Sequence, residues 1–175
     1  MDKLFVIIGQ IIGIVAMAIF FISYQAKEPK KLLALQCVAI SAMCLHYFFI
    51  GAMSGFVLNA IGLIRNICYA NRDKKFLSGK WLPIFFAVLI GVVGILFWES
   101  YYSVFIIIGL VINTLCLAIP DTQKVRASVL ITCPLVFTYD VFVFSIGGMS
   151  NEAISFTSAA IGLIRLRKSS GKTSK

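Results

Sequence analysis

Seven long apolar runs, separated by short polar stretches, set the pattern of the chain. The runs cover residues 4–23, 32–50, 52–70, 81–98, 103–119, 127–146 and 152–166. A helix of about 20 apolar residues crosses the hydrocarbon core of a bilayer. The pattern therefore predicts an all-α integral membrane protein with seven transmembrane helices.

The stretches between the runs contain the residues that end helices and form turns. Residues 147–151, and residues 51–55 where the third run begins, are uncharged and rich in glycine, which is typical of tight turns. Pro120 follows the fifth run and ends its helix. Residues 71–80 form the longest basic loop, and residues 168–175 form a basic, polar tail that we expect to be disordered.

Composition and charge place these helices in a membrane and orient them. Hydrophobic residues make up 60% of the chain and charged residues 13%, whereas soluble domains have roughly 45–50% and about 25%. With seven spans, 15 of the 16 lysines and arginines lie on one side, and only Lys3 lies on the other. The positive-inside rule makes that basic side cytoplasmic, so we expect the N-terminus outside and the C-terminus inside. The net charge of +9 is then a topology signal, and no nucleic-acid-binding pattern accompanies it.

Two sequence matches with a common offset indicate an internal repeat. Residues 60–65 (AIGLIR) recur at 160–165, and residues 5–9 resemble residues 105–109, so both matches are 100 positions apart. We therefore expect a first three-helix repeat in residues 1–75, a spacer in residues 76–100 and a second repeat in residues 101–167. A single spacer helix gives both repeats the same orientation. Parallel repeats of this kind occur in transporters, with the substrate site at the repeat interface near the middle of the membrane.

Three short motifs carry a resemblance to a known family: Ser23-Tyr24-Gln25, Leu45-His46-Tyr47-Phe48-Phe49-Ile50-Gly51 and Leu58-Asn59-Ala60-Ile61. In that order they resemble the YgjV family of bacterial inner-membrane proteins, which implies a location in the bacterial inner membrane. The 3+1+3 arrangement resembles the SWEET and PQ-loop superfamily of small transporters. The Pro-Gln pair of that superfamily is absent here, because Tyr24-Gln25 stands in its place and Asp121 follows Pro120. This departure weakens the transfer of a sugar substrate and of a proline hinge.

Polar residues on two of the predicted helices suggest a binding site. Gly55, Asn59, Gly62 and Asn66 are spaced by four, three and four, so they share one helical face. Asn113 lies on a similar stripe of small residues in the fifth run. We expect Asn59, Asn113 and Asn66 to contact a small polar substrate. The alternative is that these stripes are seams where membrane helices pack closely.

His46 and Asp140 are predicted to be the only ionisable side chains well inside the spans, at nearly the same depth. An ionisable group within a membrane is a functional-site hypothesis by default. We expect the two to form an outer gate or proton site, with each other as one candidate partner. Tyr139 is expected to add to the polar lining of the substrate-binding site. Pro134 lies in the middle of the sixth run and is expected to act as a hinge, although a static bend explains it equally well. The alternative is that His46 and Asp140 serve only helix packing and interfacial hydration.

The sequence does not support catalysis, a cofactor or a metal site. It contains one histidine and five cysteines without metal-ligand spacing, and no nucleophile–base set or phosphate-binding loop. We therefore expect a non-enzymatic transporter of a small polar solute that works by alternating access between the two repeats. A membrane receptor or scaffold protein is the alternative. Membrane lipids are the other expected partners, and homo-oligomerisation is left open.

Overall fold

The computed structural model describes residues 3–24, 29–71, 81–119 and 122–170, together with residues 74, 77 and 79. In this part of the chain there are seven helices and no strands, which confirms the all-α prediction. The helices are α1 (Lys3–Tyr24), α2 (Pro29–Ile50), α3 (Met53–Ala70), α4 (Trp81–Leu96), α5 (Ser103–Leu117), α6 (Thr122–Phe142) and α7 (Ile146–Ser170).

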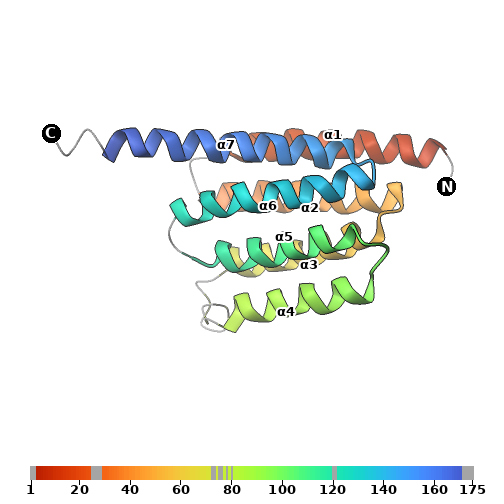
Figure 1. Cartoon of the computed structure of the whole chain (residues 1–175), viewed down its shortest axis with the longest axis horizontal. Coiled ribbons are helices and arrows are strands. Elements are labelled where there is room, and N and C mark those ends of the chain that lie inside the picture. The colour runs from red at the N-terminus through yellow and green to blue at the C-terminus, as the bar shows by residue number, and fades with distance from the viewer. Residues whose placement is uncertain are drawn as a thin grey trace.

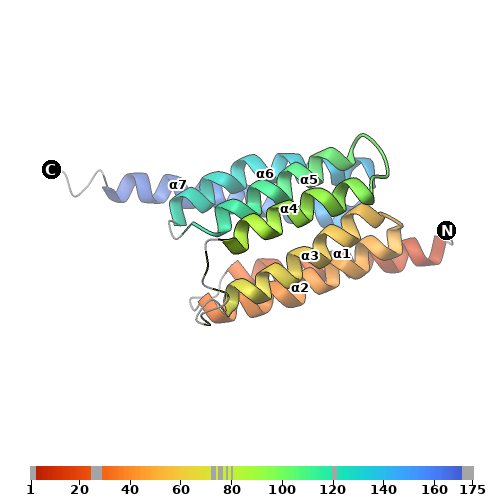
Figure 2. The same ribbon diagram turned by 90° about the horizontal axis from the view of Figure 1, so that it is seen from below.

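The helices run roughly parallel to one long axis and form two facing rows (Figure 1). In one row α2 packs between α1 and α3, and in the other α6 packs between α5 and α7. The rows meet where α1 packs on α7 and α3 packs on α5, while α4 lies beside α3 and α5. Figure 2 shows α1, α2 and α3 on one side of the molecule and α4 to α7 on the other. One end of the bundle carries the connections at residues 51–52, 97–102 and 143–145, and we call it the turn end. The opposite end is the loop end.

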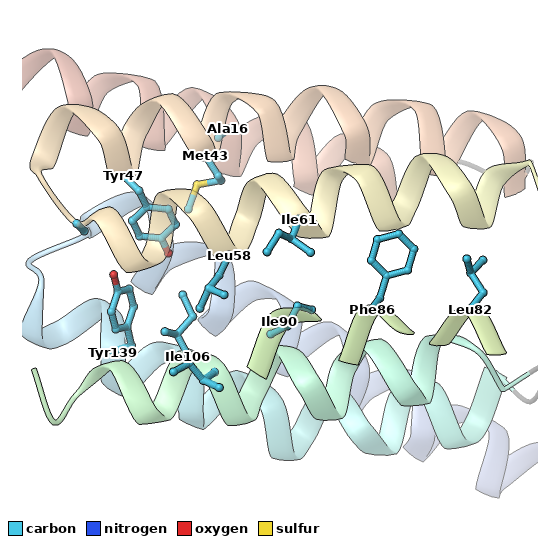
Figure 3. Packing of buried hydrophobic residues seen from close by; sticks show 12 residues of the cluster. Ala16, Met43, Tyr47, Leu58, Ile61, Leu82, Phe86, Ile90, Ile106 and Tyr139 are labelled. Carbon is cyan, nitrogen blue, oxygen red and sulfur yellow. The ribbon is translucent and has the colours of Figure 1, made fainter. Parts of the chain in front are cut away.

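Apolar side chains fill the space between helices and also cover the outside of the bundle. Leu82, Phe86 and Ile90 on α4 lie four residues apart and so share one face, which points toward Ile61 on α3 (Figure 3). Many large apolar side chains on the outer surface are exposed, as Leu96 is at 74%. An apolar surface of this extent is typical of a membrane-embedded protein.

Length and apolarity identify membrane spans among these helices with different clarity. Within the described residues, Lys3–Ser23 and Met53–Ala70 are long and apolar enough to cross a bilayer. Four further apolar stretches are shorter: Ala34–Ile50, Trp81–Leu96, Ser103–Leu117 and Ala127–Phe142. The number of helices thus agrees with the sequence pattern, and a seven-span topology stays a prediction.

The ends of the helices in the two rows are related by an interval of 93 residues. Adding 93 converts the end of α1 into the end of α5, and the start of α2 into the start of α6. The same interval relates Met53 at the start of α3 to Ile146 at the start of α7. It also relates Gly51 and Phe144, which both have positive φ angles, of 79° and 54°. The sequence matches 100 residues apart therefore do not give the register of the helices. The difference of seven residues is about two helical turns, so both registers place the same faces together.

The turn expected at residues 147–151 is wrong, because these residues form the first part of α7. The chain reverses at Phe144 and Ser145 instead. The Ser145 hydroxyl accepts a hydrogen bond from the backbone N–H of Gly148 at 3.1 Å, as expected of a residue that caps a helix N-terminus. The two glycines serve close packing. A Cβ at Gly147 would overlap the backbone of Gly13 on α1, and a Cβ at Gly148 would overlap the Asp140 carboxylate.

The remaining boundaries differ from the expected runs at their ends. α6 begins at Thr122 and ends at Phe142, whereas the sixth run was expected to span residues 127–146. α7 extends to Ser170, so residues 168–170 are helical and do not belong to the expected disordered tail. The connections expected at residues 25–28, much of 71–80, Pro120–Asp121 and the tail from residue 171 lie outside the described residues.

Candidate functional site

A cavity of about 240 Å³ lies between the two rows of helices. Residues of every helix except α4 contribute to its wall. Its polar or charged lining residues are Gln36, Tyr47, Asn59, Arg65, Asn66, Asn113, Thr132, Asn151, Glu152 and Ser155. Apolar side chains such as Ile40, Met43 and Leu110 complete it. A concave site lined mainly by apolar groups, with a few polar groups directed inward, is typical of small-molecule binding.

The cavity lies where the two helix triplets meet. Its wall contains five pairs of residues that are 93 positions apart: Phe20/Asn113, Gln36/Val129, Ile40/Cys133, Met43/Val136 and Asn59/Glu152. Equivalent positions of α1–α3 and α5–α7 thus face the same space. Two of these pairs, Phe20/Asn113 and Gln36/Val129, join an apolar and a polar side chain, and Asn59/Glu152 joins a neutral and an acidic one, so the two walls present different chemistry.

The structure brings three of the predicted site residues together at this cavity. Asn59 lies on α3, Asn113 on α5 and Asn66 nearer the loop end of α3. The Asn59 Nδ2 donates one N–H to the Gly55 carbonyl oxygen at 2.9 Å, which leaves its Oδ1 and its second N–H available to a ligand. The Asn66 Oδ1 accepts two hydrogen bonds from Arg65, which leaves the Nδ2 of Asn66 as a donor.

Two charged residues of the cavity wall were missed by the sequence analysis. Arg65 was counted only among the charges of the basic side, but its side chain is only 4% exposed and donates to the Thr114 Oγ1 at 2.6 Å. Glu152 was placed at the start of a helix, whereas it lies six residues inside α7. His46 and Asp140 are therefore not the only ionisable side chains well inside the helices, as the sequence had led us to expect, because Glu152 and Arg65 also lie there. The signal for Glu152 was the serine at position 145, which starts α7 earlier than the glycines suggest.

A hydrogen-bonded layer of buried side chains lies at the turn end of the cavity. The Tyr47 hydroxyl donates to the Asp140 Oδ1 at 2.6 Å, and Tyr47 also lines the cavity. Tyr47 and Asp140 are 93 residues apart, so this bond joins equivalent positions of α2 and α6. The Tyr139 hydroxyl accepts from the Gly55 N–H at 2.8 Å and lies 3.0 Å from the Ser54 Oγ. Figure 3 shows the rings of Tyr47 and Tyr139 pointing toward each other.

Tyr139 is therefore part of this layer and not of the cavity wall. It is fully buried, as are His46 and Asp140. The Asp140 Oδ2 is buried without a hydrogen-bond partner. A buried polar group that lacks a partner is costly, so it marks either stored strain or a function.

His46 belongs to the same layer but does not bond directly to Asp140. Its Nδ1 lies 2.7 Å from the Gly9 carbonyl oxygen, and its Nε2 lies 2.7 Å from the Ser145 Oγ. Because a carbonyl oxygen only accepts, the Nδ1 carries a proton and the Nε2 of the neutral ring accepts from the serine. His46 thus connects α2 to α1 and to the start of α7. The ring also fills the space that Gly13 leaves on α1, where a Cβ would lie 2.8 Å from the Nδ1.

The ends of two helices near this layer are held by side chains from other segments. The Glu99 carboxylate accepts from the Met53 N–H at 2.7 Å and from the Ser54 hydroxyl at 2.6 Å. At the start of α7 the Gln10 Oε1 accepts from the Ile146 N–H at 3.1 Å. Helix N-termini expose unpaired N–H groups that favour such acceptors. The Glu99 contacts thus attach the connection between α4 and α5 to the start of α3. The Gln10 contact attaches α1 to the start of α7.

Pro134 lies away from the cavity. It lines a second, mainly apolar groove between α6 and α7, which shares Cys133 and Glu152 with the cavity. α6 continues through Pro134 without a break. Within the described residues no group of three potential metal ligands is present.

Fold, surface and cavity define an all-helical membrane protein with a polar cavity between two helix triplets. The chain belongs to the Imp-YgjV family, described as bacterial inner membrane protein, whose family model matches residues 7–170. No curated protein and no solved structure matches the chain significantly. Membership confirms the family resemblance noted in the sequence and identifies the chain as a bacterial inner membrane protein.

Proposed function

We propose that this protein transports a small polar solute across the bacterial inner membrane through the cavity between its two helix triplets. The observation that carries the proposal is the cavity of about 240 Å³ with Asn59, Asn66 and Asn113 in its wall. Polar side chains inside a membrane bundle are costly, and they mark substrate pathways in many membrane proteins. Sites between parallel repeats are also where transporters of this type of architecture bind their substrates.

The layer at the turn end supports a gating role in the same proposal. Tyr47 lies three residues from the end of α2, whereas at the other end the cavity reaches Leu117, the last residue of α5. The Tyr47–Asp140 hydrogen bond joins the two triplets across the turn end. Rocking of one triplet against the other would break this bond and open the cavity to the outside. Under the positive-inside topology the turn end faces the periplasm.

Osmotic swelling of liposomes that contain the purified protein tests the proposal. A series of small polyols, amides and amino acids is added outside, and the rate of solute entry is measured by light scattering. We expect at least one solute to enter faster than in protein-free liposomes. We expect Asn59→Leu and Asn113→Leu to abolish this entry while leaving expression and melting nearly normal, because a packing hydrogen bond inside a membrane contributes only about 0.6 kcal/mol on average.

Asn71→Leu is the matched control, since Asn71 lies at the loop end of α3 and outside the cavity. This variant should transport like the parent. Entry that survives in both cavity variants would exclude the cavity as the pathway. If no solute enters faster than in empty liposomes, the protein acts as a membrane receptor or scaffold, and its polar residues serve only to hold the bundle together.

A further inference from the structure

The two ends of the cavity carry opposite charges. Glu152 lies six residues from the start of α7, and Arg65 lies twelve residues from the start of α3. Since the two helices start at equivalent turns, the two residues are about 9 Å apart along the bundle axis, at 1.5 Å per residue. The acidic side chain is closer to the turn end and the basic one closer to the loop end.

In the part of the chain that the structure describes, the side-chain hydrogen bonds of both residues go to neutral groups. Arg65 donates to the oxygens of Thr114 and Asn66. The Glu152 Oε1 accepts from the Asn151 Nδ2 at 3.1 Å. Charges within a membrane are expensive and normally pair with an opposite charge. An opposite charge on a ligand would therefore stabilise each of them.

The neutral side chains beside Glu152 and Arg65 also differ in the hydrogen-bonding groups that they offer to a ligand. Near Glu152, the Asn151 Oδ1 is buried without a hydrogen-bond partner and requires a donor. Asn59 occupies the position equivalent to Glu152 on the other wall and offers its Oδ1, together with the second N–H of its Nδ2, because the first N–H donates to Gly55. Near Arg65, the Oδ1 of Asn66 is occupied by the guanidinium, so Asn66 offers its Nδ2. The end near Glu152 thus presents mainly acceptors, and the end near Arg65 presents donors.

We propose that the solute of this cavity is a zwitterion. Its cationic N–H group lies at Glu152, Asn151 and Asn59, and its anionic oxygens lie at Arg65 and Asn66. The ionised side chains of Glu152 and Arg65 carry opposite charges that sum to zero, so a zwitterion neutralises both without a net charge entering the bundle. The inference rests on the proposed function and specifies its substrate class.

Thermal unfolding of the purified full-length protein in detergent tests whether the cavity binds a zwitterion. The probes are amino carboxylates from glycine to 6-aminohexanoate, with alkylamines and alkyl carboxylates of matching length and with glycerol as a neutral solute. Several lengths are used because the two charged residues are about 9 Å apart along the axis. A ligand that binds only the native state raises its stability. We expect an amino carboxylate to raise the melting temperature by about 5 °C or more at a hundred times its Kd, and the singly charged probes to have little effect.

Glu152→Gln keeps the size of the side chain and should abolish the response to amino carboxylates. Arg65→Gln should do the same. Glu99→Gln is the matched control, because Glu99 is a carboxylate at the turn end and outside the cavity. An equal response in the parent and in Glu152→Gln would overturn the proposal, and this test holds even if Arg65→Gln fails to fold. If glycerol is the only probe that stabilises the protein, and Asn59→Leu removes this effect, the zwitterion proposal is wrong but the transport proposal is supported. If no probe stabilises the protein and no solute enters liposomes, both proposals are wrong.

Discussion

His46 shows how one side chain can connect three helices of this bundle. Both of its ring nitrogens have partners, at Gly9 on α1 and at Ser145 before α7. The neutral ring satisfies these two contacts with one proton, whereas the protonated ring must donate to both. Protonation therefore keeps the hydrogen bond to the Gly9 carbonyl oxygen. It also keeps the contact with Ser145 if the serine hydroxyl rotates so that its oxygen accepts. This makes His46 suited to a change of protonation without loss of its neighbours.

The role of His46 in gating has a direct test in transport. If His46 takes up a proton during the transport cycle, His46→Gln should remove the pH dependence of solute entry between about pH 5.5 and 7.5, around the ordinary pKa of histidine. Solute entry is measured in the liposome assay across this range. Asp140→Asn is the companion variant, because Asp140 supplies the carboxyl group of the layer. A pH profile that is unchanged by His46→Gln would reduce the histidine to a packing residue.

At the scale of the element, the start of α7 is set by contacts that the sequence does not display. Gly147 and Gly148 resemble a turn because glycine is common in turns, yet both are helical. Gly147 permits contact between the backbones of α7 and α1, and Gly148 makes room for Asp140. Small residues have this role at many interfaces between membrane helices. The reversal itself uses Phe144, with a φ of 54°, where most non-glycine residues are disfavoured.

Alanine at Gly147 tests this packing. Its Cβ would overlap the backbone of Gly13, and backbone cannot move aside as a flexible side chain can. We expect Gly147→Ala to destabilise the protein by about 1–3 kcal/mol, the usual cost of overpacking, and to lower the melting temperature in detergent. Gly91→Ala is the control, because a Cβ there meets nothing within 4 Å. It should leave stability unchanged or raise it by up to about 1 kcal/mol, since alanine favours helix. Equal melting of both variants would contradict the close approach of α1 and α7.

At the scale of the whole molecule, the orientation of the bundle in the membrane can be tested by labelling its two ends. Residues 74 and 100 lie at opposite ends, in the connection after α3 and in that between α4 and α5. In a variant without native cysteines, Ser100→Cys should react with an impermeant thiol reagent in cells whose outer membrane is permeabilised. Lys74→Cys should react only after the inner membrane is opened, as the positive-inside rule requires. Residue 150, which the expected turn would have exposed, is unsuitable because it lies in α7. Labelling of Lys74→Cys in intact inner membranes would overturn the orientation.

The chain determined by itself that the protein is helical and belongs in a membrane. Apolar runs long enough to form helices recur along it, and a helix in a membrane satisfies its backbone hydrogen bonds within its own segment. The common face of Asn59 and Asn66 could also be predicted, because the spacing of Gly55, Asn59, Gly62 and Asn66 places them on one side of a helix. These features depend on periodicity and composition, which are properties of the sequence.

Only the tertiary structure decided which side chains meet. The register of 93 residues follows from where the chain reverses, and reversal at Ser145 moved Glu152 into α7 and level with Asn59. In the sequence Arg65 is one more charge of the basic side, but the packing of α3 against α5 directs its side chain toward Thr114. Tyr47 and Asp140 meet because α2 and α6 face each other, 93 residues apart. Such contacts join distant segments, and they depend on helix rotation and register, which a pattern of apolar residues leaves free.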